Sequence, residues 1–176
     1  MASSARSADK RRALKRGLAA IVFLGTFAVL EERIREPNRS EAMAIGTIRA
    51  ITSGESTYAG FYGYYDRLEC LATTRPCVPG VTYQNPFVSP DLAASRGERA
   101  SSRFEFHAGP KAVSPRNSRT SPSAMTQYAV VAVPLGARTG NYRAFCGDDR
   151  RTIYVTWNGE PRVDGGRCLD TSHILQ

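Results

Sequence analysis

Few side chains in this chain of 176 residues could carry chemistry, and the cysteines and histidines are the first to consider. The chain has four cysteines, Cys70, Cys77, Cys146 and Cys168, and two histidines, His107 and His173. The spacings Cys-x6-Cys and Cys-x21-Cys match no common zinc motif, and neither histidine has a second one at metal-ligand spacing. The even number of cysteines therefore favours two disulfides in an oxidising compartment, with three possible pairings, and we expect no metal and no cofactor.

Paired carboxylates are the next candidates for chemistry. Asp148 and Asp149 are adjacent and could bind calcium, but Arg150 and Arg151 follow them directly. Because a cation site needs uncompensated oxygen ligands, this arrangement favours a solvated turn. The sequence also contains no HExxH, no Gly-x-Ser-x-Gly, no P-loop and no dinucleotide-binding glycine pattern. We therefore predict a protein that is not an enzyme.

A basic stretch over residues 96–119 could bind an anion. It holds six basic residues against two acidic ones, and the basic ones are Arg96, Arg99, Arg103, Lys111, Arg116 and Arg119. These side chains could contact phosphates of nucleic acid or of lipid headgroups. The aromatic residues inside the stretch, Phe104 and Phe106, alternate along a predicted strand and belong to its core face. We therefore expect a solvated basic loop, and we do not expect nucleic-acid binding.

The N-terminal residues have the pattern of an export or anchoring signal. Residues 1–16 carry six basic side chains against one acidic side chain, within a net charge of +8 for the chain. An apolar run, GLAAIVFLGTFAVL, follows over residues 17–30, and positive charge before such a run is retained in the cytoplasm. We predict a cytoplasmic leader (1–16), an apolar anchor with a charged continuation (17–36) and an exported domain (37–176). As a helix the run would span about 21 Å of a hydrocarbon core of roughly 30 Å, so a cleaved signal is the alternative to a retained anchor.

The rest of the chain predicts one helix followed by strands. Pro37 and Asn38 begin a helix over residues 38–62, whose apolar stripe ends in the aromatic cluster Tyr58, Phe61, Tyr62, Tyr64 and Tyr65. That cluster could be a ligand platform, but core and rim packing is the more common role. Strands are predicted over residues 103–108, 127–133, 142–146 and 152–157, and loops over 68–90 and 109–126. The order indicates an α+β fold in which the long helix lies on a small antiparallel sheet.

Several short motifs resemble the type IV pilin and type II secretion pseudopilin family. The segment EAMAIGTIRAI at residues 41–51, with Ser56-Thr57-Tyr58-Ala59 after it, is similar to the helix of small pilin-like proteins. The segment YAVVAVP at 128–134, then Thr139-Gly140 and Phe145-Cys146-Gly147-Asp148, is similar to their strand, loop and ending. The resemblance covers most of residues 17–160 in order. It implies a processing site at Gly17-Leu18 and, at the fifth position after the cut, a glutamate that here is Val22.

These observations together predict a divergent, membrane-anchored pilin-like protein, a pseudopilin or minor pilin with a structural or assembly role. The membrane would be contacted through residues 17–30, and other pilin-like subunits through the N-terminal helix. The protein would cross the inner or cell membrane once, with its C-terminal domain periplasmic or extracellular. The alternative function is a small disulfide-closed binding domain, secreted or anchored, that uses the basic loop for an acidic ligand.

The cysteine pairing can also be predicted from position in the chain. Cys70 and Cys77 lie in one proline-rich loop after the helix, so we expect them to pair. The remaining pair, Cys146 with Cys168, would tie the end of a strand to the C-terminal segment, which otherwise has few apolar residues.

Overall fold

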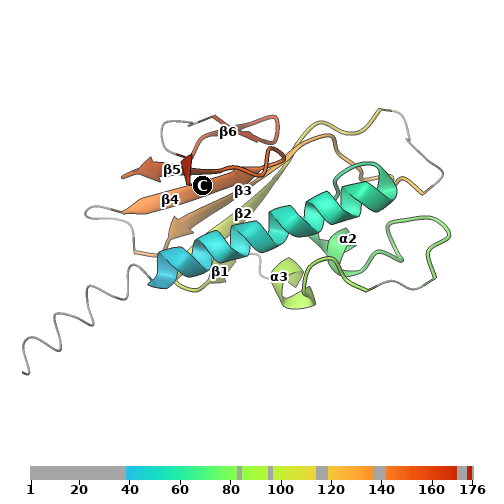
Figure 1. The fold of residues 1–176 in the computed structure, drawn as a ribbon, viewed down its shortest axis with the longest axis horizontal. Coiled ribbons are helices and arrows are strands. Elements are labelled where there is room, and N and C mark those ends of the chain that lie inside the picture. Colours follow the sequence, from blue (N-terminus) through green and yellow to red (C-terminus); the bar gives the residue numbers. More distant parts are fainter. Residues whose placement is uncertain are drawn as a thin grey trace, which may run out of the picture. The chain divides into compact units, whose positions relative to one another are not determined.

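The computed structural model describes residues 39–82, 85–94, 97–113, 119–136, 142–169 and 174–175. In the unit Ser40–Gln176, one long helix packs on a small antiparallel sheet, which confirms the predicted α+β class (Figure 1). The predicted leader, the apolar run and the processing position Gly17-Leu18 lie outside the described residues. Within the described ranges, no helix combines the length and the apolar character that crossing a membrane requires.

The long helix covers residues 39–62 and presents its apolar stripe to the sheet. Ile48, Ile51, Tyr58 and Tyr62 are buried at steps of three, seven and four residues, which place them on one face of the helix. The predicted aromatic cluster is mainly core: Tyr58 and Tyr62 are buried, whereas Phe61 is 62% exposed at the rim. At the start of the helix, Arg143 of the sheet donates two hydrogen bonds to the carboxylate of Glu41.

The main sheet has six strands in the order β1-β2-β3-β4-β5-β8, and every neighbouring pair is antiparallel. The strands are β1 (Gly97–Arg99), β2 (Ser102–Ala108), β3 (Tyr128–Pro134), β4 (Arg143–Asp148), β5 (Ile153–Trp157) and β8 (Ile174–Leu175). A separate hairpin joins β6 (Val163–Asp164) to β7 (Arg167–Cys168). The four predicted strands are confirmed to within one residue at each end, except that β4 continues two residues further than predicted, through Gly147 to Asp148.

Strand β1 was not predicted, because its turn carries no glycine. The connection to β2 is Ala100-Ser101, and both residues have positive φ, at 52° and 61°. Two such residues form the tight turn whose twist matches that of paired strands, and Asn-Gly or Asp-Gly is its usual sequence. Because neither residue here is the expected one, the sequence pattern gave no sign of a hairpin.

The sheet is covered on both faces. On one face Tyr128, Val130 and Ala132 of β3 pack with the long helix, and Phe104 and Phe106 of β2 pack beside them as predicted. On the other face, a smaller cluster surrounds β7. It consists of Ala129, Val131, Val133, Ala144, Cys146, Tyr154 and Cys168. Strand β3 is therefore buried on both sides, which explains why its sequence is a continuous apolar run.

The segment after the helix is more regular than the predicted loop over residues 68–90. It contains two helices of five residues, α2 (Leu68–Ala72) and α3 (Pro90–Ala94), which are too short to show a helical period in sequence. Leu71, Val78 and Val88 are buried in the main core. The predicted disulfide between Cys70 and Cys77 is present and closes the loop after α2.

The second predicted loop, over residues 109–126, was expected to be exposed, but its C-terminal part is held against the domain. Met125 is buried and exchanges two backbone hydrogen bonds with Tyr65, at 2.9 and 3.1 Å. Lys111 forms a further bridge to Met125. Residues 114–118 lie outside the described ranges. The predicted exposure is therefore wrong for the C-terminal end of this segment, and both ends are held against the end of the long helix.

Two glycines of the long helix provide a matched test of this packing. A Cβ at Gly54 would lie 2.6 Å from Val88 Cγ1 and 2.8 Å from the carbonyl oxygen of Phe87, whereas a Cβ at Gly46 meets nothing within 4 Å. We expect Gly54→Ala to lower the free energy of unfolding by about 1–3 kcal/mol through overpacking. Gly46→Ala should raise it by about 0.5–1 kcal/mol through helix propensity. Urea unfolding measures both, and an equal effect of the two variants would contradict the observed packing of residues 87–88 on the helix.

Candidate functional site

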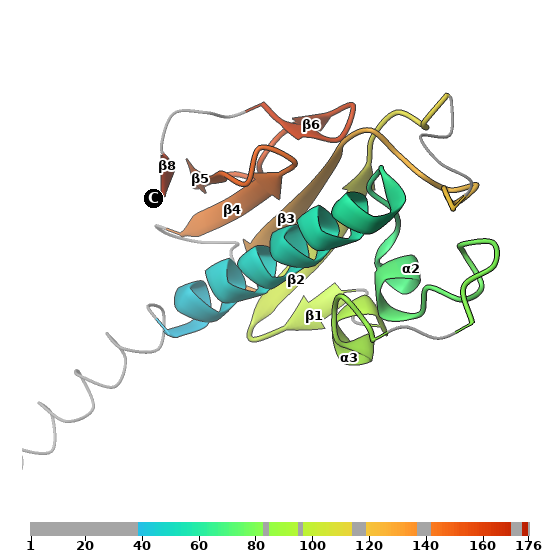
Figure 2. The same cartoon turned by 45° about the vertical axis from the view of Figure 1, so that its right-hand side comes forward.

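A groove of about 730 Å³ lies between the long helix, α2, α3 and the β1–β2 edge of the sheet. Figure 2 shows α2, α3 and β1 gathered on the same side of the long helix. Six large apolar side chains line it: Ile51, Leu68, Leu92, Phe104, Phe106 and Val130. Its volume lies within the range of pockets that hold small molecules, and its apolar lining is typical of them.

Charged side chains form the rim of the groove. Arg103 pairs with Glu105 at 3.0 Å and with Glu160 at 2.6 Å, and His107 lies 3.6 Å from Glu105. Arg67 and Arg99 also line the groove, and neither forms an ion pair with any residue that the structure describes. The rim therefore has two uncompensated guanidinium groups, whereas Glu105 is already neutralised.

Only part of the predicted basic loop lines the groove. Arg99 lies on β1 and Arg103 on β2, and both line the groove. Lys111 and Arg119 lie on the anchored segment and do not line it, and Arg96 and Arg116 lie outside the described residues. Arg67 was not predicted as a site residue, because its position 32 residues before Arg99 gives no sequence signal that the two line one groove.

Two fully buried carboxylates, Glu55 and Asp66, lie near the end of the long helix. Asp66 accepts hydrogen bonds from the hydroxyls of Tyr58, at 2.9 Å, and Ser123, at 2.7 Å. The backbone amide of Asp66 donates to Glu55 Oε2 at 3.2 Å. These contacts join the helix to the connection after it and to the returning segment that carries Ser123.

Burial changes the protonation equilibria of Glu55 and of Tyr58. Burial raises the pKa of Glu55 well above its ordinary value, and the nearby charge of Asp66 raises it further. Glu55 Oε1 and the hydroxyl of Tyr128 are both buried without a hydrogen-bond partner among the described residues. Burial and the charge of Asp66 also raise the pKa of Tyr58, which remains a hydrogen-bond donor. The surroundings of Glu55 therefore favour its neutral, protonated form.

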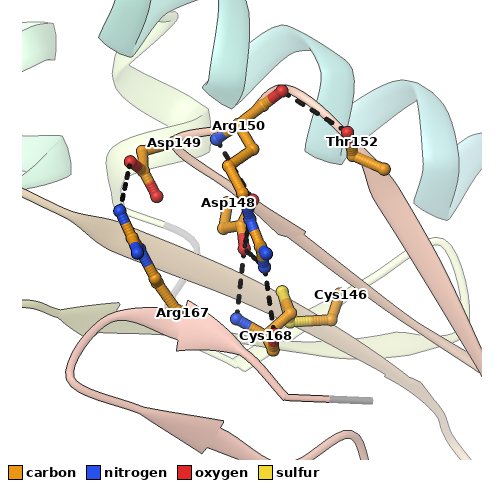
Figure 3. Close-up of polar contacts among 7 residues, drawn as sticks. All are labelled: Cys146, Asp148, Asp149, Arg150, Thr152, Arg167 and Cys168. Carbon is orange, nitrogen blue, oxygen red and sulfur yellow. Dashed lines mark hydrogen bonds and ion pairs between the residues drawn. A yellow bond between two sulfur atoms is a disulfide. The ribbon is translucent and has the colours of Figure 1, made fainter. Parts of the chain in front are cut away.

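The Asp148-Asp149 pair is not the solvated turn that the sequence predicted. Asp148 is fully buried and accepts hydrogen bonds from Arg150 Nε, at 3.0 Å, and from the amide of Cys168, at 3.2 Å (Figure 3). Arg150 also donates to the carbonyl oxygen of Cys168 at 3.0 Å, and its guanidinium lies over the ring of Tyr154. Arg150 therefore compensates the buried carboxylate of Asp148. An arginine that follows an aspartate in the sequence does not show that the aspartate is exposed to solvent.

This contact lies beside the second disulfide, which is also as predicted. Cys146 of β4 is bonded to Cys168 of β7, and both are buried in the smaller core. Arg167 lies 3.7 Å from Asp149, whose pKa is raised mainly by burial (Figure 3). The Asp148 contact and the disulfide thus hold the β6–β7 hairpin on the sheet by two independent links.

None of the described residues forms a cluster of histidine, cysteine or carboxylate side chains that could hold a metal ion. Comparison of the chain with protein families, curated proteins and solved structures found no match.

The buried Glu55 gives a pH-dependent stability. Its pKa is higher in the folded than in the unfolded chain, so folding retains a proton and the stabilisation is greatest below the ordinary glutamate pKa. This stabilisation falls as the pH rises towards the pKa of Glu55 in the folded chain, by at most about 1.4 kcal/mol per pH unit. We expect Glu55→Gln to remove this dependence on pH. Between pH 5 and pH 8, the free energy of unfolding of the variant, measured in urea, should therefore rise relative to that of the parent protein.

Glu98→Gln on the exposed strand β1 is the matched control and should leave the slope unchanged. If the parent protein and Glu55→Gln lose stability in parallel over this range, Glu55 is ionised in the folded state and the inference of a neutral carboxyl is wrong.

The contact of Asp148 with Arg150 can be tested by comparing a substitution of Asp148 with the same substitution of the adjacent Asp149. Asp148→Asn keeps the size of the side chain but removes the charge that Arg150 compensates, and we expect it to lower the free energy of unfolding by about 1–3 kcal/mol. Asp149→Asn should change it by less than about 1 kcal/mol, because Asp149 is only weakly paired. Equal effects of the two substitutions would show that Asp148 has no special role.

Proposed function

We propose that this protein is a non-enzymatic, membrane-anchored subunit of the pilin or pseudopilin kind, with a structural or assembly role in a type IV pilus or type II secretion system. The observation that carries the proposal is the order of its elements. One long helix follows the basic and apolar N-terminal residues, and after α2 and α3 comes an antiparallel sheet on which the apolar stripe of the helix packs. Those pilin-like motifs that fall within the described residues lie on that helix, on β3 and on β4.

The cysteines support the proposed location outside the cytoplasm. The described residues include no free cysteine, and both disulfides are formed. Disulfides of this kind persist in exported proteins and are rare in the cytoplasm. In the proposal, residues 17–30 anchor the chain in the inner or cell membrane, and the domain from residue 37 lies in the periplasm or outside the cell.

The outer face of the long helix is compatible with contact to another pilin-like subunit. Ala42, Gly46 and Ala50 are exposed there, and small side chains let a second helix approach closely. Inside the membrane, the family resemblance implies that a glutamate pairs with the amino terminus of a neighbouring subunit, and here that position is Val22. We therefore propose a minor subunit that depends on other subunits for assembly.

The missing glutamate provides the test. Val22→Glu would supply the carboxylate for the intermolecular pair, so we expect it to raise the recovery of the protein in sheared filament fractions by at least severalfold. The substitution Ile21→Glu places the same charge one position away and should not raise recovery.

Export is measured in parallel with alkaline phosphatase fused after Gln176, which should be active for the parent protein and both variants. Abundant filaments of the unmodified protein alone would contradict the proposed minor role. An inactive reporter in the parent protein would contradict the anchored, exported arrangement.

A further inference from the structure

The groove between α2, α3 and the β1–β2 edge has the features of a binding site that the proposed assembly role does not use. Its floor is built by apolar side chains that belong to the main core or pack against it, such as Ile51, Phe104 and Val130. A volume of about 730 Å³ can enclose the apolar part of a small molecule. The floor therefore favours an aliphatic or aromatic body over a fully polar ligand.

The charges of the rim select the other part of the ligand. Of the acidic groups, Glu105 is held by Arg103, and Glu69 has an interaction of its own. Of the basic groups, Arg67 and Arg99 are exposed and have no ion pair with a described residue. A guanidinium group binds a carboxylate through two parallel hydrogen bonds, a geometry that an ammonium or hydroxyl ligand cannot offer.

Two observations suggest that Arg67 and Arg99 are not needed for folding. Arg67 precedes α2 with an extended backbone and makes no side-chain cap for that helix. Arg99 is exposed on β1, the strand at the edge of the sheet, where it is paired through its backbone with Ser102 of β2. Both side chains are therefore available to a ligand at little cost to the fold.

From the apolar floor and the uncompensated rim we infer that this groove binds a small amphipathic carboxylate, a molecule with an aliphatic body and an anionic head. The body lies against the floor, and the head is bound by Arg67 or Arg99. This activity is separate from assembly, because the groove does not include the outer face of the long helix that carries Ala42, Gly46 and Ala50.

The test uses three ligands with the same aliphatic chain. The full-length protein, in nanodiscs of a zwitterionic lipid, is labelled at its isoleucine and leucine methyl groups and titrated with octanoate, octan-1-ol or octylammonium. Octanoate should shift the methyl signals of Ile51, Leu68 and Leu92. We expect octan-1-ol to bind at least about tenfold more weakly than octanoate, and octylammonium more weakly still.

Arginine variants then identify the head-group contact. Arg67→Ala or Arg99→Ala should weaken octanoate binding at least about tenfold and leave octan-1-ol binding unchanged. Arg49→Ala, an exposed arginine of the long helix that does not line the groove, is the matched control and should change neither. Thr47→Phe, at a half-buried position that lines the groove, should reduce binding of all three ligands by filling the space.

Three results would overturn the inference. These are an absence of methyl shifts with octanoate up to its solubility limit, equal affinity for the three ligands, and unchanged octanoate binding in both Arg67→Ala and Arg99→Ala. Unchanged methyl spectra of the unliganded variants verify that each substitution leaves the groove folded.

Discussion

The close approach of the long helix to the sheet at Gly147 is the constraint on which the rest of the structure depends. A side chain at Gly147 of β4 would overlap Ile48 of the helix, so the two elements can pack at this distance only because glycine is present. Gly147 is paired with Val130 on one side and Ile153 on the other, which places the contact in the middle of the sheet. The distance set there allows the apolar stripe of the helix to bury itself against three consecutive strands.

Three buried acidic residues attach further segments to this helix–sheet core, and their burial is compensated in different ways. Asp148 follows the glycine directly and is compensated by Arg150, which also contacts the chain at Cys168. Glu55 has no ion pair with a described residue, and its raised pKa favours the neutral form, while Asp66 is stabilised by hydroxyl and amide donors. Because a buried charge without a partner costs several kcal/mol, each arrangement fixes the position of the segment that supplies the partner. The C-terminal hairpin and the segment around Ser123 are positioned in this way.

The sequence predicted the elements with strong periodicity and missed those determined by distant contacts. The helix over residues 39–62 and strand β3 were identified because their apolar patterns extend over several turns or residues. Strand β1 was missed because Ala100-Ser101 adopts a glycine-like turn, and Asp148 was misjudged because the arginine after it indicated solvent. The groove could not have been found at all, since Arg67 and Arg99 are 32 residues apart in the chain and line the same groove only in the folded structure. Local patterns report local structure, and this site is not local.

The order of the disulfide pairs along the chain affects how the protein can mature. Each bond joins cysteines that are consecutive in sequence, Cys70 with Cys77 and Cys146 with Cys168. In a chain that is exported from its N-terminus, an oxidase that joins each cysteine to the next one to emerge produces the native pairs directly. Non-native pairs, which are corrected by thiol–disulfide exchange, arise only if Cys77 is still reduced when Cys146 emerges. The long separation between those two residues gives the first bond time to close, so maturation in the proposed compartment requires an oxidant but no isomerase.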